Sequence, residues 1–586
     1  MTEHFEVVGH DGAARLGELR LADPVVTPAL VDDVLVDAGS RWREEPPTPA
    51  GDDGHLTVLP HRGLPAGTDP EVEAAFAEPA PEVDFPAAAV GAPATAERLG
   101  AGGADAFLLS TAQGLVGHAE AFVDAVVRTK EALPADVALG LSGVATPRNA
   151  ATLVYAGVDL LDAERAAVAG TRGRYLTRED DRPLDALEEL TCPCPACDAG
   201  LDAFDREACA EHNRRALAAE LATVRERIRQ GRLRDYVEAQ ARHDQWLTGV
   251  LRRLDDRWGY LEPRTPVHRR ATIAATTDDA MRRVEIRRFA DRVTARYVGR
   301  FGGPLVLVPC SARKPYGDSK SHARFHETIH YRGHKVSMTS PIGVVPQELE
   351  LTYPAQHYDT TVTGRWSETE IDFVARVLGR YLDRVEYDRV VAHVPEEGYR
   401  AAVERALEGR DLPVEFTVAD HPTDDDSLAA LAAALEGEGQ YTKRERERRT
   451  VRAIADFQFG DGAGEALFDD VRIQAPWPKH RVHDPDGEQL AALEPSYGLL
   501  ALTLEGARRW ADSTVPVRRV TIDSFVPHGS VLAPGVVDAS DGIRVGDEVV
   551  VEGPQAFGVG RAEMHGAEMA SSSRGVAVDV RHVEER

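Results

Sequence analysis

Short apolar runs alternate with helical patterns over the first 240 residues of the chain. The runs AFLLS (106–110) and VALGLSG (137–143) predict two buried strands, and the amphipathic segment 119–133 predicts a helix between them. This rhythm is typical of parallel strands joined by helical crossovers, as in a barrel. At the start of the chain, FEVVGHDGAARLGELRL predicts a hairpin that turns at a glycine. We therefore expect an α/β barrel domain over residues 1–240.

The pattern changes several times after residue 240. Residues 210 to about 300 are Arg-rich and predicted to be helical, and 241–300 form a helical connector. The charged helix faces either carry solvated i,i+4 ion pairs or form an RNA-facing stripe. The runs LVLVPCS and VVAHVP predict buried strands of a middle α/β domain over 301–440. After the charged run KRERERR, we expect a small α+β domain over 447–512 and a β-barrel over 516–586. The predicted fold class is therefore multidomain α/β and α+β.

The charge composition bears on the partners of the chain. It carries 68 Lys and Arg against 97 Asp and Glu, a net charge of −29, which on its own argues against nucleic acid as a partner. Only six of the basic residues are Lys, and an acidic, Lys-poor composition is typical of salt-loving archaea. In concentrated salt the Debye length falls to about 3 Å or less, so surface charge says little about partners. We expect a halophilic archaeon as the source.

The features that report on location predict a cytoplasmic protein. The start, MTEHFEVVGHDG, is acidic and polar, unlike a secretory signal. No apolar run reaches about 18 residues, so no membrane contact is expected. Five cysteines in 586 residues are too few for a disulfide framework.

Four of the five cysteines lie between Cys192 and Cys209. Cys192, Cys194 and Cys197 form a C-x-C-x2-C knuckle, and His212 follows on a helix-forming stretch. Zinc prefers four such ligands in a tetrahedron, and three cysteines with one histidine leave no open position. The spacing therefore predicts a structural Zn²⁺ that clamps a loop to a helix. Cys209 is the alternative to His212 as the fourth ligand.

A second concentration of reactive side chains follows the strand LVLVP. Three of the six lysines lie between residues 310 and 340, and Lys is a compact charge whose pKa burial can lower. Ligands commonly bind beside the carboxyl ends of such strands. The segment PCSARKPYGDSKSH therefore holds the candidate catalytic residues Cys310, Ser311, Lys314, Tyr316, Asp318, Ser319 and His322.

Four histidines near this segment offer an alternative reading. His322, His326, His330 and His334 recur every four residues, a spacing that would align metal ligands on one helix. However, YRGHKVSM contains a glycine and has a strand-like pattern, which argues against a continuous helix. A metal at these histidines is therefore the lesser alternative.

The cysteine knuckle followed by His-Asn resembles the zinc site of the tRNA-guanine transglycosylases. The segment GVDLLDAERAAVAGTR (157–172) resembles that family's GVDMFDCVLPTR, which implies that Asp162 occupies the position of the aspartate that attacks the ribose. The family's D-S-G-G-F-Q signature, source of the second active-site aspartate, is missing. The resemblance thus implies a degenerate TIM-barrel-like domain without base exchange, in which Asp162 is either a relic of the active site or a contact to base or ribose.

The tail of the chain resembles the tail of archaeal transglycosylases. DFQFGDGAGEALF and GLLALTLEGARRW resemble their small C2 domain. Residues 517–583, with an A-P-G-V turn, G-D-E-V-V-V and a final R-G-V-A-V strand, resemble a PUA domain. This likeness implies recognition of tRNA by its shape. The candidate phosphate contacts are Arg518, Arg519, Arg561 and Arg574.

The motif PCSxxKPYxxSxSH beside a zinc knuckle and a PUA tail resembles the archaeosine synthase family, paralogues of the archaeal transglycosylases. The likeness covers essentially the full chain. It implies a tRNA that carries 7-cyano-7-deazaguanine (preQ0) in its D-loop, whose nitrile receives an amine from free lysine, ammonia or glutamine. A radical-SAM enzyme that releases archaeosine and a second copy of the chain are the other expected partners.

Addition of an amine to a nitrile sets requirements for the side chains. A base must take a proton from the amine, and a proton donor must protonate the imide nitrogen that develops. Lys314 and Tyr316 are candidate donors, and Asp318 and His322 are candidate acceptors. Cys310 is an alternative first nucleophile, through a thioimide. Two acidic residues are candidates to hold the ammonium of the amine: Glu348 and Glu350.

Two other functions compete with amine transfer. An active transglycosylase would need two aspartates, and the sequence offers one candidate. A non-catalytic tRNA-binding subunit would leave the concentration of Lys and Ser at 309–322 unexplained.

Overall fold

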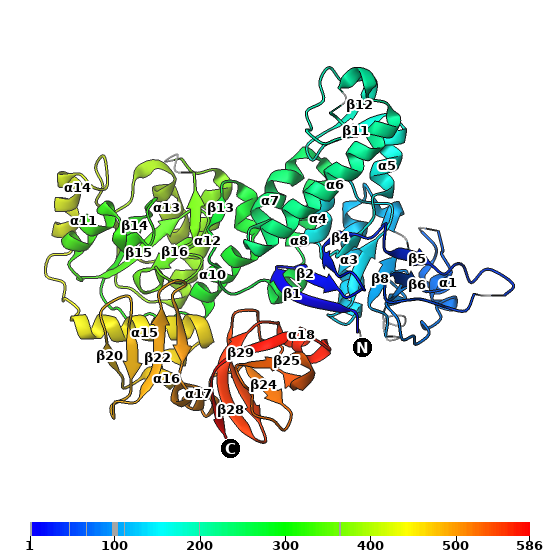
Figure 1. The fold of residues 1–586 in the computed structure, drawn as a ribbon. Coiled ribbons are helices and arrows are strands. Elements are labelled where there is room, and N and C mark those ends of the chain that lie inside the picture. The colour runs from blue at the N-terminus through cyan, green and yellow to red at the C-terminus, as the bar shows by residue number, and fades with distance from the viewer. Residues whose placement is uncertain are drawn as a thin grey trace.

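The computed structural model describes residues 3–586 except 46, 66, 97–102, 111, 199 and 362–364. The N-terminal barrel and the middle α/β domain lie at opposite ends of the molecule, joined by helices (Figure 1). The small domain and the C-terminal barrel lie below them in that view, and an arm tipped by β11 (Arg174–Leu176) and β12 (Asp181–Pro183) projects upward. No described helix is both long and apolar enough to cross a membrane.

The predicted N-terminal hairpin is confirmed. It pairs β1 (Phe5–Asp11) with β2 (Ala14–Leu19), and β3 (Val25–Thr27) extends the antiparallel sheet. Gly12 stands at the turn with φ 71°, a left-handed conformation that favours glycine.

Seven parallel strands form the sheet of the N-terminal domain, in the order β4-β10-β9-β8-β7-β6-β5. The edge strands β4 and β5 are separated by only four residues. A flat sheet of this size would be about 29 Å wide at about 4.8 Å per strand, whereas the short connection reaches at most about 18 Å. The sheet therefore curls into a half-barrel. Its strands are Ala29–Leu30, Leu35–Asp37, Leu56–Val58, Ala87–Gly91, Ala106–Leu109, Ala138–Leu141 and Leu160–Leu161 for β4 to β10.

Only part of this sheet has the helical crossovers of a TIM barrel. The predicted βαβ unit is confirmed, with α3 between β8 and β9. Among the described residues no helix separates β4, β5 and β6, and only the short α1 lies between β6 and β7. The barrel is therefore degenerate, as the resemblance implied. Its helices are α1 (Pro70–Ala75), α3 (Ala119–Ala132), α4 (Ala150–Tyr155) and α5 (Glu164–Thr171).

Five helices form the centre of the molecule: α6 (Arg206–Arg229), α7 (Leu233–Gln240), α8 (Gln245–Asp255), α9 (Trp258–Arg264) and α10 (Val284–Ala295). Several arginines in or directly before these helices are buried, contrary to both predictions from the sequence. Arg234 and Arg283 are 4% and 3% exposed and share the carboxylate of Glu238 at 2.8 and 2.7 Å. Because buried charges need partners, these arginines belong to the packing between domains.

The middle domain is a five-stranded sheet in the order β16-β15-β14-β18-β19, parallel except for β16. Alternate residues of β14 point to opposite faces. Val306 and Val308 pack against α11 and α14, whereas Leu305 and Leu307 pack against the side of α12 and α13. The strands are β14 (Leu305–Pro309), β15 (His334–Thr339), β16 (Gly343–Pro346), β18 (Val390–Ala392) and β19 (Val414–Phe416), and the helices are α11 (Lys320–Ile329), α12 (Glu368–Arg384), α13 (Ala401–Leu407) and α14 (Asp425–Ala434).

The charged run 443–449 opens helix α15 (Lys443–Phe459), which starts with a capping box of Thr442 and Glu445. With α16 (Ala463–Phe468) and α17 (Leu504–Ala511), this helix packs on an antiparallel sheet of β20 (Arg472–Gln474), β21 (Arg481–His483), β22 (Gln489–Glu494) and β23 (Leu499–Leu502). The C-terminal half-barrel contains β24 (Arg519–Ile522), β25 (Ser530–Leu532), β26 (Val536–Ala539), β27 (Glu548–Gly553), β28 (Ala556–Ala562), α18 (Gly566–Ser571) and β29 (Val576–Glu585).

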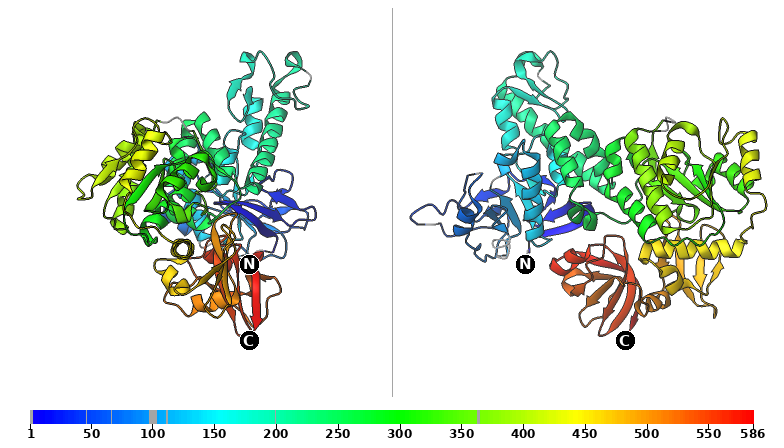
Figure 2. Two further views of the ribbon diagram at one scale, coloured as in Figure 1. Left: turned by 90° about the vertical axis from the view of Figure 1, so that its left-hand side faces the viewer. Right: turned by 180° about the vertical axis from the view of Figure 1, so that it is seen from behind.

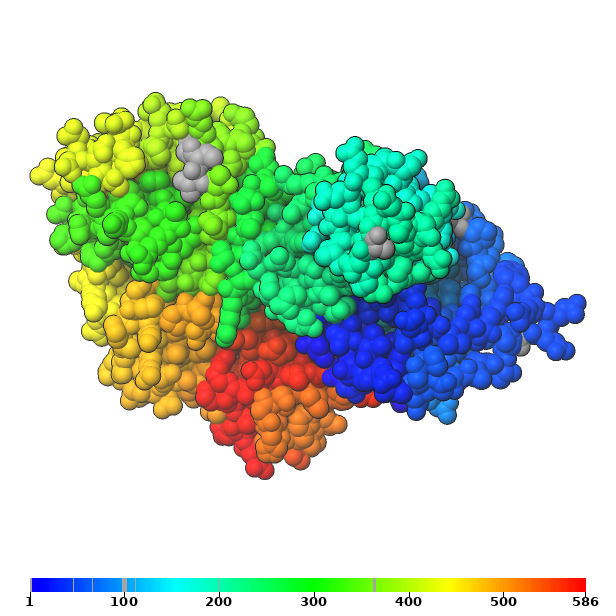
Figure 3. All heavy atoms as spheres, turned by 45° about the horizontal axis from the view of Figure 1, so that its top comes forward, coloured from blue at the N-terminus to red at the C-terminus, as the bar shows by residue number. Residues whose placement is uncertain are grey.

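The C-terminal half-barrel packs against the N-terminal hairpin, and the two remain side by side when the molecule is seen from behind (Figure 2). His10 Nε2 lies 3.1 Å from Glu568 Oε1, and Ser573 Oγ donates to Asp136 Oδ2 at 2.6 Å. The same seam is visible in the space-filling view, where the red and dark blue surfaces meet (Figure 3).

This seam should weaken in acid. Burial lowers the pKa of His565 to about 4. Burial raises the pKa of Glu568, but the charge and hydrogen bond of His10 outweigh it and lower that pKa to about 2. Both pKa values are depressed on folding, so the stability they contribute is present at neutral pH and lost as pH falls, from about 6.5 for His565. By pH 5 the His565 contribution falls by about 2 kcal/mol. Thermal unfolding of the wild type should shift down between pH 7 and pH 5, and His565→Gln should flatten that dependence; an unchanged slope would contradict it.

Candidate functional site

The knuckle and the long helix bring four ligand atoms together at the tip of the arm. The sulfurs of Cys192, Cys194 and Cys197 and a ring nitrogen of His212 lie within 4.8 Å of one another. Cys194 Sγ is 3.6 Å from Cys197 Sγ, and His212 Nδ1 is 3.6 and 3.5 Å from these two sulfurs. A zinc tetrahedron with Zn–S bonds of about 2.3 Å has edges of about 3.5–3.8 Å. The group therefore fits a four-coordinate metal with no open position.

The surroundings orient His212 for this role. Its Nε2 donates to the carbonyl of Leu176 at 2.9 Å, so Nδ1 keeps the lone pair that a metal needs. Tyr175 stacks on the imidazole with ring centroids 3.9 Å apart. Cys209, the alternative ligand, is fully buried and its thiol donates to the carbonyl of Arg174 instead. The geometry favours His212.

Asp162 follows β10 at the carboxyl end of the half-barrel. Its carboxylate accepts from the amide of Gly143 at 2.9–3.0 Å and from Glu164 N at 3.1 Å. Asp32, which the sequence reading missed, accepts from Ala163 N beside it, and burial together with the charge of Asp162 raises its pKa. Both carboxylates therefore act as caps for neighbouring backbone.

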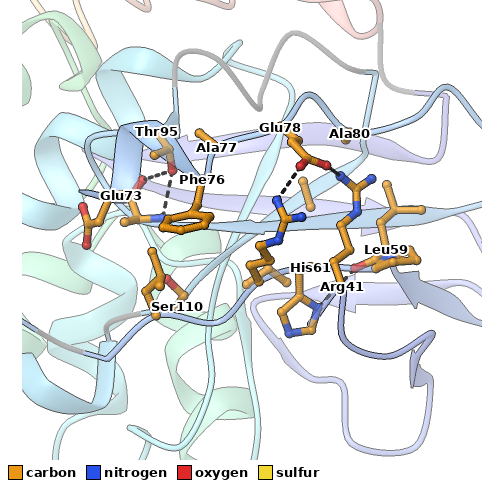
Figure 4. A pocket seen from close by; sticks show the side chains of 17 residues that line it. Arg41, Leu59, His61, Glu73, Phe76, Ala77, Glu78, Ala80, Thr95 and Ser110 are labelled. Atoms are coloured by element: carbon orange, nitrogen blue, oxygen red, sulfur yellow. Dashed lines mark hydrogen bonds and ion pairs between the residues drawn. The ribbon is translucent and has the colours of Figure 1, made fainter. Parts of the chain in front are cut away.

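A small hollow lies at the ends of β6, β7 and β8, where a barrel enzyme would hold its substrate (Figure 4). Its volume is about 60 Å³, room for roughly four to six waters at about 10–15 Å³ each. The two arginines on its wall, Arg41 and Arg62, both pair with Glu78. The barrel end thus has little space and no unpaired cation on this wall among the described residues.

The carboxyl end of β14 gathers polar groups from separate loops. Cys310 is half-buried, and its Sγ lies 3.4 Å from the hydroxyl of Tyr399. Lys314 Nζ lies 3.9 Å above the ring of Tyr358. Burial lowers the pKa of Lys314, and Cys310 and Asp359 oppose that shift. Sequence reading missed both tyrosines because each arrives from a distant part of the chain.

Of the other candidate residues in the segment 309–322, some support the local structure and others line a cavity. Tyr316 is fully buried, and its hydroxyl lies 2.6 Å from that of Tyr358. Ser319 caps α11 by accepting from His322 N, and Ser311 Oγ accepts from Arg313 N. Asp318 is exposed on the wall of a cavity, which His322 also lines.

That cavity, of about 520 Å³, lies between the middle domain and α15. Glu350 lies on its wall and accepts from Gly317 N at 3.1 Å. Burial raises the pKa of Glu350, an effect that nearby Lys335 opposes. Glu348 points the other way, into the core, where it accepts from Tyr297 at 2.8 Å and pairs with His334 at 3.0 Å. Of the two predicted amine-binding carboxylates, only that of Glu350 therefore lies on the cavity.

The four regularly spaced histidines do not meet. His322 and His326 lie on α11, His330 ends that helix in a left-handed conformation, and His334 lies in β15. Within the part of the chain that the structure describes, the cysteine–histidine group is the only metal-ligand cluster of three or more such residues.

The four predicted RNA-binding arginines differ in their surroundings. Arg518 is buried and pairs with Asp547 at 3.2 Å. Arg519 pairs with Glu552, and Arg561 bonds to the hydroxyl of Tyr497. Arg574 has no ion-pair or hydrogen-bond partner among the described residues, which makes it the best placed of the four for a phosphate.

Four sequence families match consecutive parts of the chain. Residues 62–245 match queuine tRNA-ribosyltransferase, and 286–435 match a domain of unknown function (DUF5591). Residues 449–516 match the patch-forming domain C2 of tRNA-guanine transglycosylase, and 515–583 match the PUA domain. The half-barrel, the Cys3His group and the PUA tail define a protein of the tRNA-guanine transglycosylase class.

Full-length relatives narrow this class. The chain is 58% identical over 588 residues to the archaeosine synthase of Haloferax volcanii, with 100% of both chains covered. It is 40% identical over 635 residues to the archaeosine synthase subunit alpha of Methanosarcina acetivorans, again over 100% of both. A tRNA-guanine(15) transglycosylase of Methanothermobacter thermautotrophicus is 30% identical, over 78% of this chain and 68% of its own. The chain belongs to the archaeosine synthase family.

Proposed function

We propose that this protein converts preQ0 in the D-loop of tRNA toward archaeosine, by adding the ε-amine of free lysine to the nitrile. The observation that supports it most is the end-to-end similarity to two archaeosine synthases. Ammonia and glutamine nitrogen are the alternative donors. A radical-SAM partner enzyme would then release archaeosine from a lysine adduct, and all of these steps belong in the cytoplasm.

The proposed addition balances without a redox cofactor. The amine nitrogen forms a bond to the nitrile carbon, one π bond of the nitrile opens, the nitrile nitrogen gains a proton and the amine loses one. The product is a substituted amidine. The protein must therefore supply a proton donor, a proton acceptor and a binding place for each substrate.

Lys314 is the proposed proton donor to the nitrile nitrogen. Burial lowers the pKa of its ammonium and makes it a stronger acid than an ordinary lysine. Its ammonium lies over the ring of Tyr358. Hydrogen bonds between the hydroxyl of Tyr358 and those of Tyr316 at 2.6 Å and Thr339 at 2.7 Å hold that ring in place. Asp318, exposed on the cavity wall, is the proposed acceptor for the proton of the amine.

Cys310 offers a covalent variant of the same reaction. Its thiol would add to the nitrile to give a thioimidate, and the amine would then displace the thiol. Atoms balance in both steps: the thiol proton passes to the imide nitrogen when the sulfur adds, and the departing thiolate takes the proton that the entering amine loses. The hydroxyl of Tyr399, 3.4 Å from the sulfur, is placed to assist.

The rest of the chain is proposed to deliver the tRNA. The PUA domain would hold the tRNA by shape, with Arg574 on a phosphate. The Cys3His group would bind Zn²⁺ and stiffen the arm without taking part in the chemistry.

The test is direct. The protein is incubated in concentrated salt with preQ0-tRNA and lysine, and the tRNA is digested to nucleosides for mass spectrometry. A lysine adduct or amidine supports the proposal. Release of a free base would instead indicate a transglycosylase, and unchanged preQ0 with tRNA binding retained would indicate a non-catalytic subunit.

A further inference from the structure

We propose that the cavity between the middle domain and helix α15 binds a free amino acid, with its carboxylate on Lys335 and its ammonium facing His322 and Glu350. This inference rests on the proposed function, because it assigns the cavity to the amine donor. It adds a binding site and gives an anchoring role to Lys335, one of the three lysines between residues 310 and 340.

Lys335 is a buried cation without a partner. The residue is 4% exposed and lines the cavity, yet within the described chain its Nζ has no hydrogen bond or ion pair. Burial lowers the pKa of Lys335, and Glu350 and Glu348 oppose this shift from a distance. An unpaired buried ammonium is costly to keep, so a carboxylate entering the cavity would find a strong and otherwise unsatisfied donor.

His322 provides the complementary acceptor. It is 1% exposed, and its Nε2 must be the protonated nitrogen because it donates to the carbonyl of Pro309 at 3.0 Å. The other nitrogen, Nδ1, is therefore a lone-pair acceptor, and it is buried without a partner. Burial and the charge of Lys335 lower the pKa of His322 to about 3, which keeps the ring neutral. A neutral acceptor and the carboxylate of Glu350 both suit an ammonium.

These features together select the class of ligand. The wall carries both signs of charge: Lys443 and Arg446 lie on it besides Lys335, and Glu327 and Glu447 besides Glu350. A phosphate would satisfy the cations but would meet the carboxylates, and a plain amine would leave Lys335 unpaired. A zwitterion satisfies both signs at once. The cavity's volume of about 520 Å³ lies within the range of about 300–1,000 Å³ typical of small-molecule sites.

The cavity also adjoins the proposed chemistry. Pro315, Gly317 and Asp318 form part of its wall, and the same loop carries Lys314. An amino acid anchored by its carboxylate at Lys335 would thus lie beside the loop that is proposed to hold the nitrile. Binding energy from the carboxylate would position the reacting amine.

The test measures binding without tRNA. Equilibrium dialysis of the full-length protein with labelled lysine, and with lysine methyl ester as competitor, compares the wild type with Lys335→Met. The wild type should bind lysine at least tenfold more tightly than the ester. Lys335→Met should bind lysine at least tenfold more weakly and no longer distinguish it from the ester. Lys320→Met, an exposed lysine on the same helix as His322, is the matched control.

Several outcomes would overturn the inference. These are equal binding of lysine and ester by the wild type, undiminished binding by Lys335→Met, or competition by a nucleobase but not by amino acids. Folding of the variant is checked by thermal unfolding, where loss of an unpaired buried charge should leave Tm unchanged or raise it. If the wild type forms adduct but Lys335→Met keeps the same KM for lysine, this inference fails while the proposed function stands. If the wild type binds lysine but forms no adduct, the proposed function fails instead.

Discussion

Alanine at Lys314 should lower the rate of adduct formation on preQ0-tRNA by about 10²–10⁴-fold, the usual contribution of a positioned general acid. The affinity for tRNA should stay within about twofold, because the side chain lies over Tyr358 rather than on the predicted RNA-binding surface. Single-turnover kinetics with saturating tRNA measure the first quantity, and filter binding in the same salt measures the second.

Controls make this prediction specific. Lys320→Ala removes an exposed lysine six residues away and should leave the rate unchanged. Since burial lowers the pKa of Lys314, the wild-type rate should begin to fall at a pH below the ordinary lysine range, as the acid deprotonates. A Lys314→Ala enzyme that loses activity only in proportion to tRNA binding would show that Lys314 contacts RNA instead. If Lys314→Ala forms the adduct at the wild-type rate, Lys314 has no role in the mechanism.

Cys310 separates the direct and covalent routes in the same assay. If the thioimidate route operates, preQ0-tRNA without an amine should become linked to the wild type but not to Cys310→Ala. If the amine adds directly, no linkage forms and Cys310→Ala retains most of the rate.

Local sequence patterns predicted those features of the molecule that depend on neighbouring residues. The apolar run 305–309 predicts a strand, and the polar residues after it predict that the chain leaves the sheet there. Cys310 and Lys314 therefore follow the carboxyl end of β14. The knuckle at 192–197 and His212 required only ligand spacing and a helix. Both depend on residues within about 20 positions of each other.

Tertiary packing decided what the sequence reading could not resolve. Glu348 and Glu350 are equally acidic in the sequence, but the short helical turn Gln347–Leu349 directs Glu348 to His334 and leaves Glu350 on the cavity. The cavity itself needs α15 from the next domain. Arg234 and Arg283 look like solvated helix residues until the carboxylate of Glu238 is seen between them.

Removal of one metal ligand should have the largest effect on structure. Cys194→Ser should reduce bound zinc from about one per chain to near zero and unfold the arm around residues 174–205. Structural zinc binds with an apparent free energy of about 10–16 kcal/mol, and the arm's core otherwise contains only a small group of buried side chains, including Tyr175, Leu187 and Phe204. Metal analysis measures the first effect. Hydrogen exchange and limited proteolysis across the arm measure the second.

Cys209→Ser is the matched control, because it changes the same atom fifteen residues away. Cys209 Sγ donates to the carbonyl of Arg174, and a serine hydroxyl can replace that bond, so zinc should be retained. His212→Ala should lose zinc like Cys194→Ser, since Nδ1 lies 3.5–3.6 Å from two of the sulfurs. Zinc retained in His212→Ala but lost in Cys209→Ser would reverse the assignment of the fourth ligand. Because the arm projects away from the middle domain that contains Lys314 (Figure 1), the zinc-free variants should weaken tRNA binding more than the rate at saturating tRNA.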